Sequence, residues 1–320
     1  MKADPIYVDK TLFVGRVEEQ KQFRAALAEL LSAPPGEDLP YALHLYGDGG
    51  MGKTTLARRF RDIAQVEQPF EGSFQLLWVD WEDERRRNAE LQGGREHVSP
   101  EAVFDILHAN AVHQKWGKHF KAYQEMVKKR GEADKKAAQA ISGMGEGHEL
   151  AALRGAGATA IAKILRLSLP IGEPGEQVAK AFLEVGIKVG AEQAAQLRAA
   201  VENRLRASLD PKQFDIFLHP NEQLALAFGE GLKKLAESKP LIIVLDTYEI
   251  VDRADLWVRV AMREAGPAIL LVISGRNNLV RSGQFGSEYF KGYADEFPRR
   301  LHSPPAGTGS ALVSPPACKI

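Results

Sequence analysis

Eight residues near position 50 have the types and the spacing needed to surround a phosphate group. Residues 47–54 satisfy the pattern G-x-x-x-x-G-K-[ST] without a mismatch. Glycines let the backbone turn tightly with its N–H groups pointing at an anion, and the lysine reaches the outer phosphates as a point charge. A threonine hydroxyl at the last position can bind Mg²⁺. The pattern therefore predicts a nucleoside triphosphate site formed by Gly47, Asp48, Gly49, Gly50, Met51, Gly52, Lys53, Thr54 and Thr55.

A magnesium ion at such a loop also needs an acidic group from a second strand. The run 241–245 is entirely apolar and ends at Asp246. Ligands of open α/β sheets bind at the carboxyl ends of the strands, so a carboxylate at this position reaches the same edge as the loop. The sequence therefore predicts Thr54 and Asp246 as the metal residues. A turn-forming aspartate after a buried strand is the plainer alternative.

Hydrolysis of a triphosphate further needs a group that orients or deprotonates the attacking water. Position 247 is a threonine, so the next carboxylate is Glu249, and Glu82 beyond another apolar run is a second candidate. Arg276 follows the apolar run 268–273 after a Ser-Gly pair, where a cation would face the outermost phosphate. We assign Glu249 and Arg276 to catalysis. The plainer alternative for Glu249 is an exposed residue in the first turn of a helix. The plainer alternative for Arg276 is a loop arginine that contacts only solvent.

Alternating strands and helices must position these residues. Short apolar runs that predict strands buried on both faces lie at 41–46, 74–80, 241–245 and 268–273. A helical period follows the first run at 56–65, and another separates the last two runs at 251–264. Such alternation favours βαβ units. We therefore predict an α/β fold in which a parallel sheet is flanked by helices.

A gap of about 160 residues separates the second predicted strand from the third, far more than the usual 2–6-residue connection. Its composition is helical rather than low-complexity. Ser99 and Pro100 form a helix start, and apolar side chains recur at helical spacing between 116 and 127. We expect a nucleotide-binding core at 1–82 and 240–296, a large helical insertion at 83–239, and a disordered Pro/Gly-rich tail at 297–320.

Composition narrows the class of protein. The 320 residues carry 42 Lys+Arg and 42 Asp+Glu, so the formal net charge is +0 and no global charge points to nucleic acid. The single cysteine, Cys318, excludes an internal disulfide and a Cys-rich zinc site. No apolar run approaches the roughly 20 residues that span a bilayer, and no secretory signal is visible. We expect a cytoplasmic protein with no membrane partner.

A local basic run departs from this balance. It consists of Lys115, Lys118, Lys121, Lys128, Lys129, Arg130, Lys135 and Lys136. Interleaved aromatic residues would suit contacts with nucleic-acid phosphates. A solvated helix face is nevertheless the preferred interpretation, so DNA is a possible partner but not the favoured one. His108 and His113 are expected to line a surface rather than to hold a metal.

Together these segments resemble the AAA-type and STAND-type signalling ATPases, which are P-loop NTPases. Residues 47–54 match the Walker A loop of that family, 241–246 its Walker B strand, and 273–276 its sensor-1 strand and arginine. Residues 13–18 look like its N-terminal hydrophobic-Gly-Arg-x-Glu motif, which packs against the nucleotide base. The resemblance implies ATP or ADP with Mg²⁺ as ligands, an ASCE-type strand order, and nucleotide contacts from Val14, Gly15 and Arg16.

The chain also departs from the family pattern. Thr247 stands where the family has a glutamate after Walker B, and no lid or sensor-2 arginine follows the sensor-1 segment. We therefore expect a truncated fragment. The leading hypothesis is a signalling switch that binds ATP, hydrolyses it, and couples its nucleotide state to a protein partner or to self-association. The alternatives are a DNA-associated AAA+ ATPase of the origin-recognition or loader type and a non-hydrolysing, nucleotide-dependent interaction module.

Overall fold

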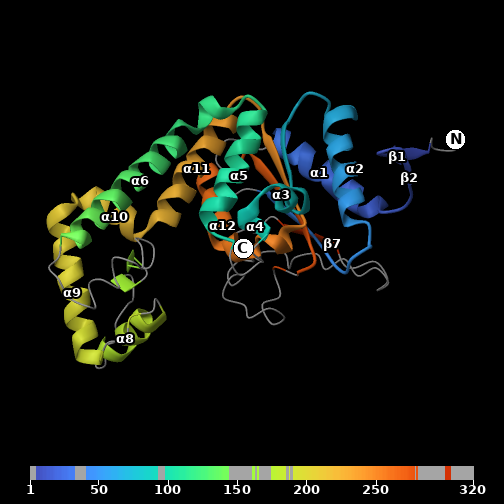
Figure 1. The fold of residues 1–320 in the computed structure, drawn as a ribbon. Coiled ribbons are helices and arrows are strands. Elements are labelled where there is room, and N and C mark those ends of the chain that lie inside the picture. The colour runs from blue at the N-terminus through green and yellow to red at the C-terminus, as the bar shows by residue number, and fades with distance from the viewer. Residues whose placement is uncertain are drawn as a thin grey trace, which may run out of the picture. The chain divides into compact units, whose positions relative to one another are not determined.

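The computed structural model describes residues 5–32, 41–92, 98–143, 161–162, 164–165, 174–184, 187, 190–277, 279 and 300–303. The chain divides into two compact units (Figure 1). The first consists of Met1–Ala122 and Ala225–Ile320, and the second of Tyr123–Leu224. The expected insertion spans 83–239, so the second unit lies within that segment and is shorter at both ends.

A parallel sheet forms the centre of the first unit. Its strands are β3 (Tyr41–Tyr46), β4 (Gln75–Asp80), β5 (Leu241–Asp246), β6 (Ile269–Gly275) and β7 (Arg300–Ser303). The strand order is β4-β5-β6-β3-β7, and every neighbouring pair is parallel. The first four strands correspond to the four predicted apolar runs. The prediction of an α/β fold with a parallel sheet flanked by helices is confirmed.

The central strands are apolar along their whole length because both faces of the sheet are covered. Every residue of β5 and β6 is buried, as continuous Val/Ile/Leu runs in a parallel sheet should be. One face packs against α1 (Val17–Ser32) and α2 (Lys53–Val66). Phe23 of α1 and Phe60 of α2 stack there with ring centroids 4.2 Å apart.

Further helices complete the first unit, and Figure 1 shows α5 and α12 on the side of the sheet opposite to α1 and α2. They are α3 (Trp81–Arg87), α4 (Ala89–Gln92), α5 (Pro100–His113), η2 (Gly117–Phe120), α11 (Pro220–Ala236, which begins in the second unit), η3 (Tyr248–Ile250), η4 (Asp252–Ala254) and α12 (Asp255–Ala265). The predicted helix start is observed: Ser99 caps α5 by accepting from the Ala102 amide at 3.1 Å, and Pro100 occupies the first turn.

A short hairpin precedes α1. Strands β1 (Ile6–Val8) and β2 (Thr11–Phe13) pair antiparallel. Asp9 and Lys10 form the turn with φ angles of 45° and 68°, the left-handed backbone that two-residue hairpin turns use. The Asp9 carboxylate binds Arg58 and Arg61 of α2. These ion pairs attach the hairpin to the helix that follows the glycine-rich loop.

The second unit is helical and has its own core. The helices whose bounds lie within the described residues are α6 (Lys121–Ser142, which begins two residues before the unit), α8 (Pro174–Glu184), α9 (Ala191–Ser208) and α10 (Pro211–Leu218). Apolar side chains from all four helices contribute to one buried cluster, including Ala137, Phe182, Val201 and Phe217. Asp210 caps α10 by accepting from the Gln213 amide at 2.9 Å.

Only part of the expected tail at 297–320 can be compared with the structure. Residues 300–303 form β7 and pair with Ala42–Leu45 of β3. The remaining positions of that segment, including Cys318, lie outside the described residues. Within the described ranges, no helix combines the length and the apolar character needed to cross a membrane.

Candidate functional site

The glycine-rich loop connects the end of β3 to the start of α2. Gly50 and Gly52 have φ angles of 79° and 78°, a left-handed conformation that costs glycine little and other residues more. Gly52 is the N-cap of α2 and has no side chain to occupy the free amides of the first turn. The loop and the helix N-terminus therefore offer unshared backbone N–H groups of the kind that bind anions.

Lys53 folds back over this loop. Its Nζ atom donates to the carbonyl oxygens of Gly47 and Asp48, both at 2.8 Å. Burial lowers the pKa of Lys53, with the carboxylate of Glu249 opposing that change and the guanidinium of Arg276 adding to it. The pKa of Lys53 therefore depends on both residues that the sequence assigns to catalysis.

Asp246 lies at the carboxyl end of β5, 1% exposed. Its Oδ1 atom accepts from the Thr247 amide at 3.0 Å, whereas Oδ2 is buried without a hydrogen-bond partner. A buried carboxylate oxygen without a partner is costly in a folded protein. A cation would satisfy it, and the carboxylate and the Thr54 hydroxyl are both oxygen ligands of the type that Mg²⁺ prefers. These residues therefore fit a magnesium ion.

A second carboxylate lies beside Asp246. Asp80 ends β4 and is in register with Asp246 across the parallel ladder. Burial raises the pKa of Asp80, and the Asp246 carboxylate raises it further. The Thr247 hydroxyl donates to Asp80 Oδ1 at 3.4 Å. Asp80 is not among the site residues predicted from the sequence, although it too ends a largely apolar run, which is the signal that identifies Asp246.

Glu249 and Arg276 are partners in the structure. Arg276 Nε and Glu249 Oε1 form an ion pair at 3.1 Å, and the Arg276 amide donates to Oε2 at 3.1 Å. Arg276 Nη2 lies 3.9 Å from the point that a Cβ on Gly49 would occupy, so the guanidinium borders the loop. The other candidate base, Glu82, is in α3 and binds Arg85 at 2.7 Å.

The N-terminal motif contacts the loop directly. Arg16 has a left-handed backbone with φ 54°, and its Nη2 atom donates to the Met51 carbonyl at 3.1 Å. Its Nη1 atom binds Glu19 at 2.8 Å. The neighbouring Gly15 carbonyl accepts from Gln20, and Val14 is 79% exposed. The structure thus places the predicted Val14–Arg16 segment against the loop by way of Arg16.

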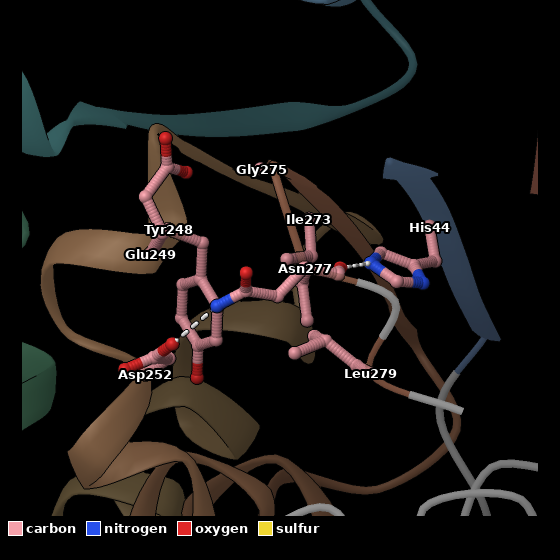
Figure 2. Close-up of a pocket in the computed structure, with 8 residues that line it drawn as sticks. All are labelled: His44, Tyr248, Glu249, Asp252, Ile273, Gly275, Asn277 and Leu279. Carbon is pink, nitrogen blue, oxygen red and sulfur yellow. Dashed lines mark hydrogen bonds between the residues drawn. The ribbon is translucent and has the colours of Figure 1, made fainter. Parts of the chain in front are cut away.

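A narrow crevice lined by both polar and apolar side chains adjoins the Glu249–Arg276 pair (Figure 2). Asn277 lies in it between His44 and Asp252. The side-chain Nδ2 atom of Asn277 donates to Asp252 Oδ2 at 2.6 Å, and the backbone carbonyl of Asn277 accepts from His44 Nε2 at 3.1 Å. The three residues come from three separate segments of the chain. No spacing rule links these three residues, so the sequence alone does not predict their contact.

Among the described residues, no group of three or more His, Cys, Asp or Glu side chains is arranged around a common metal position. No protein-family model, curated protein or solved structure matches this chain.

Proposed function

We propose that this protein binds ATP and ADP with Mg²⁺ at the loop 47–54. The supporting observation is the convergence of charges at one sheet edge. The loop at the end of β3, Asp246 at the end of β5, and the Glu249–Arg276 pair all neighbour Lys53 closely enough to affect its pKa. A cation, free helix amides and a buried acidic oxygen are the groups that a magnesium–triphosphate complex requires.

The strand order supports a P-loop ATPase of the AAA or STAND type. Strand β6 lies between β3, which leads into the loop, and β5, which ends at Asp246. An additional strand between the loop strand and the aspartate strand defines the ASCE type expected from the sequence. The segments that carry the proposed nucleotide contacts then meet at the carboxyl ends of β3, β5 and β6, where ligands of such sheets bind.

In the proposed mechanism, Lys53 exchanges the carbonyls of Gly47 and Asp48 for the outer phosphate oxygens. Thr54 and Asp246 would hold a magnesium ion, whose positive charge would stabilise the transferring phosphoryl group. Glu249 orients a water molecule and accepts its proton while the water oxygen bonds to the γ-phosphorus. The bond from that phosphorus to the bridging oxygen of ADP breaks, which yields ADP and inorganic phosphate.

Release of Glu249 from Arg276 must precede this step, because a carboxylate bound by a guanidinium is a poor base. The γ-phosphate is the competing anion for Arg276. The site therefore distinguishes ATP from ADP by whether the Glu249–Arg276 pair is open. We propose that a protein partner, or a second copy of the chain, responds to that difference, which makes the protein a nucleotide-dependent signalling switch. A non-hydrolysing interaction module would use the same difference without turnover.

The charges of the second unit do not favour the DNA-associated alternative, because acidic residues lie among the basic ones. Helix α6 carries Glu125, Glu132 and Asp134 among its basic residues, and Arg130 pairs with Asp134 at 3.7 Å. A cavity of about 550 Å³ next to this helix is also lined by side chains of both signs. Such a surface lacks the continuous basic stripe that phosphate contacts require. Steeply salt-dependent retention of duplex DNA would favour the alternative.

Equilibrium dialysis with labelled ATP, with Mg²⁺ or with a chelator, tests the proposal. We expect saturable binding that Mg²⁺ strengthens in the wild-type protein. The Asp246→Asn variant should bind ATP equally with and without the metal, because its buried oxygen no longer carries charge. Wild-type protein that retains no ATP in either condition would disprove the proposed function.

A further inference from the structure

The residue after Arg276 is held more firmly than Arg276 itself. Asn277 is 5% exposed, whereas the Arg276 side chain is 69% exposed. Asn277 is fixed at two points: its side-chain amide donates to Asp252 at 2.6 Å, and its backbone carbonyl accepts from His44 at 3.1 Å. Because the acceptor is a carbonyl, His44 must carry its proton on Nε2.

The partners of Asn277 belong to the segments that form the site. His44 lies in β3, three positions before the first glycine of the loop. Asp252 follows Glu249 by three positions in the segment after β5. Both partners are 1% exposed, so water does not compete for these hydrogen bonds and they hold a defined geometry. Asn277 therefore connects the strand of the phosphate loop to the segment that carries Glu249.

We propose that Asn277 is a positioning residue that holds Arg276 at the phosphate loop through its hydrogen bond to Asp252. Figure 2 shows the Asn277 side chain directed at Asp252, while the Glu249 side chain points away from that pair. The backbone on the carboxyl side of Arg276 is thus fixed by Asp252 and His44, and its own amide is fixed by Glu249. Without the Asp252 bond, the guanidinium loses its defined position beside Gly49.

The nucleotide part of the test rests on the proposed function, because Arg276 is there the residue that detects the γ-phosphate. Loss of the hydrogen bond between Asn277 and Asp252 should reduce the preference for ATP over ADP, measured as the ratio of their two dissociation constants. A purely structural role for Asn277 would lower the melting temperature and leave that ratio unchanged. The ratio therefore separates positioning from stability.

An exchange of the two side chains gives a sharp test. Asn277→Asp places two carboxylates together and removes the hydrogen bond. The double variant Asp252→Asn/Asn277→Asp restores it with donor and acceptor exchanged, at the same net charge and composition. Asn277→Ser is a milder variant in case the first does not fold. Tyr248→Phe is the matched control, because it removes a buried 2.8 Å bond to Asp255 from the same crevice.

Calorimetry with ATP and ADP, and hydrogen exchange of the Arg276 amide, are the two measurements. We expect Asn277→Asp and Asn277→Ser to lower the ATP preference about tenfold and to expose the Arg276 amide, which Glu249 otherwise protects. The exchanged pair should recover both properties, and Tyr248→Phe should change neither.

The inference would be overturned if Asn277→Ser kept the wild-type ratio of the ATP and ADP dissociation constants and the wild-type protection of the Arg276 amide. It would also be overturned if the exchanged pair recovered neither property. A wild-type protein that binds no nucleotide would remove the proposed function but not this test. The exchange rate of the Arg276 amide would then decide by itself whether Asn277 positions Arg276.

Discussion

The Arg276 guanidinium and the Glu249 carboxylate form an ion pair at 3.1 Å, and the Arg276 backbone amide reinforces it at the second carboxylate oxygen. Two residues from different strand ends thereby neutralise each other beside Lys53. Such a pair keeps a base inactive until an anion competes for the arginine. Under the proposed function, this pair would keep the nucleotide-free site closed to hydrolysis.

Replacement of Glu249 tests its proposed role in turnover. Glu249→Gln keeps the size and the hydrogen-bonding oxygen but cannot accept a proton. We expect steady-state phosphate release to fall about 10²–10⁴-fold, the usual contribution of a general base, while ATP still binds. Glu82→Gln is the control, because Glu82 pairs with Arg85. Unchanged turnover in Glu249→Gln would remove this residue from the mechanism.

The Asp246 carboxylate should reduce the stability of the protein in the absence of ligand. Its Oδ2 atom is buried without a hydrogen-bond partner, and a charged oxygen in that position is costly. Asp246→Asn should therefore raise the free energy of unfolding by about 1–2 kcal/mol without nucleotide or metal. Chemical denaturation in the presence of a chelator measures this, and a less stable variant would contradict the account.

Arg16 should support the loop by its bond to the Met51 carbonyl. We propose Arg16→Asn, because asparagine tolerates the left-handed backbone at this position but is too short to reach Met51. One such hydrogen bond contributes about 0.5–1.5 kcal/mol, so nucleotide affinity should fall about 3–10-fold in calorimetry. Arg24→Ala is the control, since Arg24 binds Glu67 instead. Equal losses in both variants would argue against a specific role for Arg16.

Asp255 should make stability depend on pH. Burial raises its pKa to about 7, and Asp252 adds to the rise, although Arg259 and Tyr248 oppose it. The folded state then holds a proton that the unfolded chain releases near pH 4. The contribution of Asp255 to the free energy of unfolding is therefore fully present below that pH and is lost as the pH rises through 7. The free energy of unfolding of the wild-type protein should decline relative to Asp255→Asn between pH 4 and 7. A constant difference would contradict this.

The sequence predicts those parts of the fold whose signal is local. The apolar runs at 41–46, 74–80, 241–245 and 268–273 identify four strands because a parallel strand covered on both faces has no polar side. Strand β7 has no such signal, since Arg300–Ser303 is short and mostly polar and its partner β3 is far away in the sequence. The β1–β2 hairpin is missed because Asp9-Lys10 is not a typical turn pair.

The same limit applies to the site. The loop 47–54 and Asp246 carry patterns within a few residues of sequence. The bond between Asn277 and Asp252 joins the ends of two strands, and the pairing of Glu249 with Arg276 depends on the strand order. Sequence spacing contains no information on which strands are neighbours. These contacts therefore become visible only when the sheet is assembled.

Calorimetric titration of ATP into three forms of the protein tests the central claim most directly. The forms are the wild type, Lys53→Ala and the control Lys239→Ala. Both lysines donate to backbone carbonyls of loops, but Lys53 lies at the carboxyl ends of the strands and Lys239 lies at their amino ends. With Mg²⁺ present, the account predicts equal affinity for wild type and Lys239→Ala, and at least a tenfold loss, about 1.4 kcal/mol, for Lys53→Ala. Equal ATP affinity in all three forms would contradict the account.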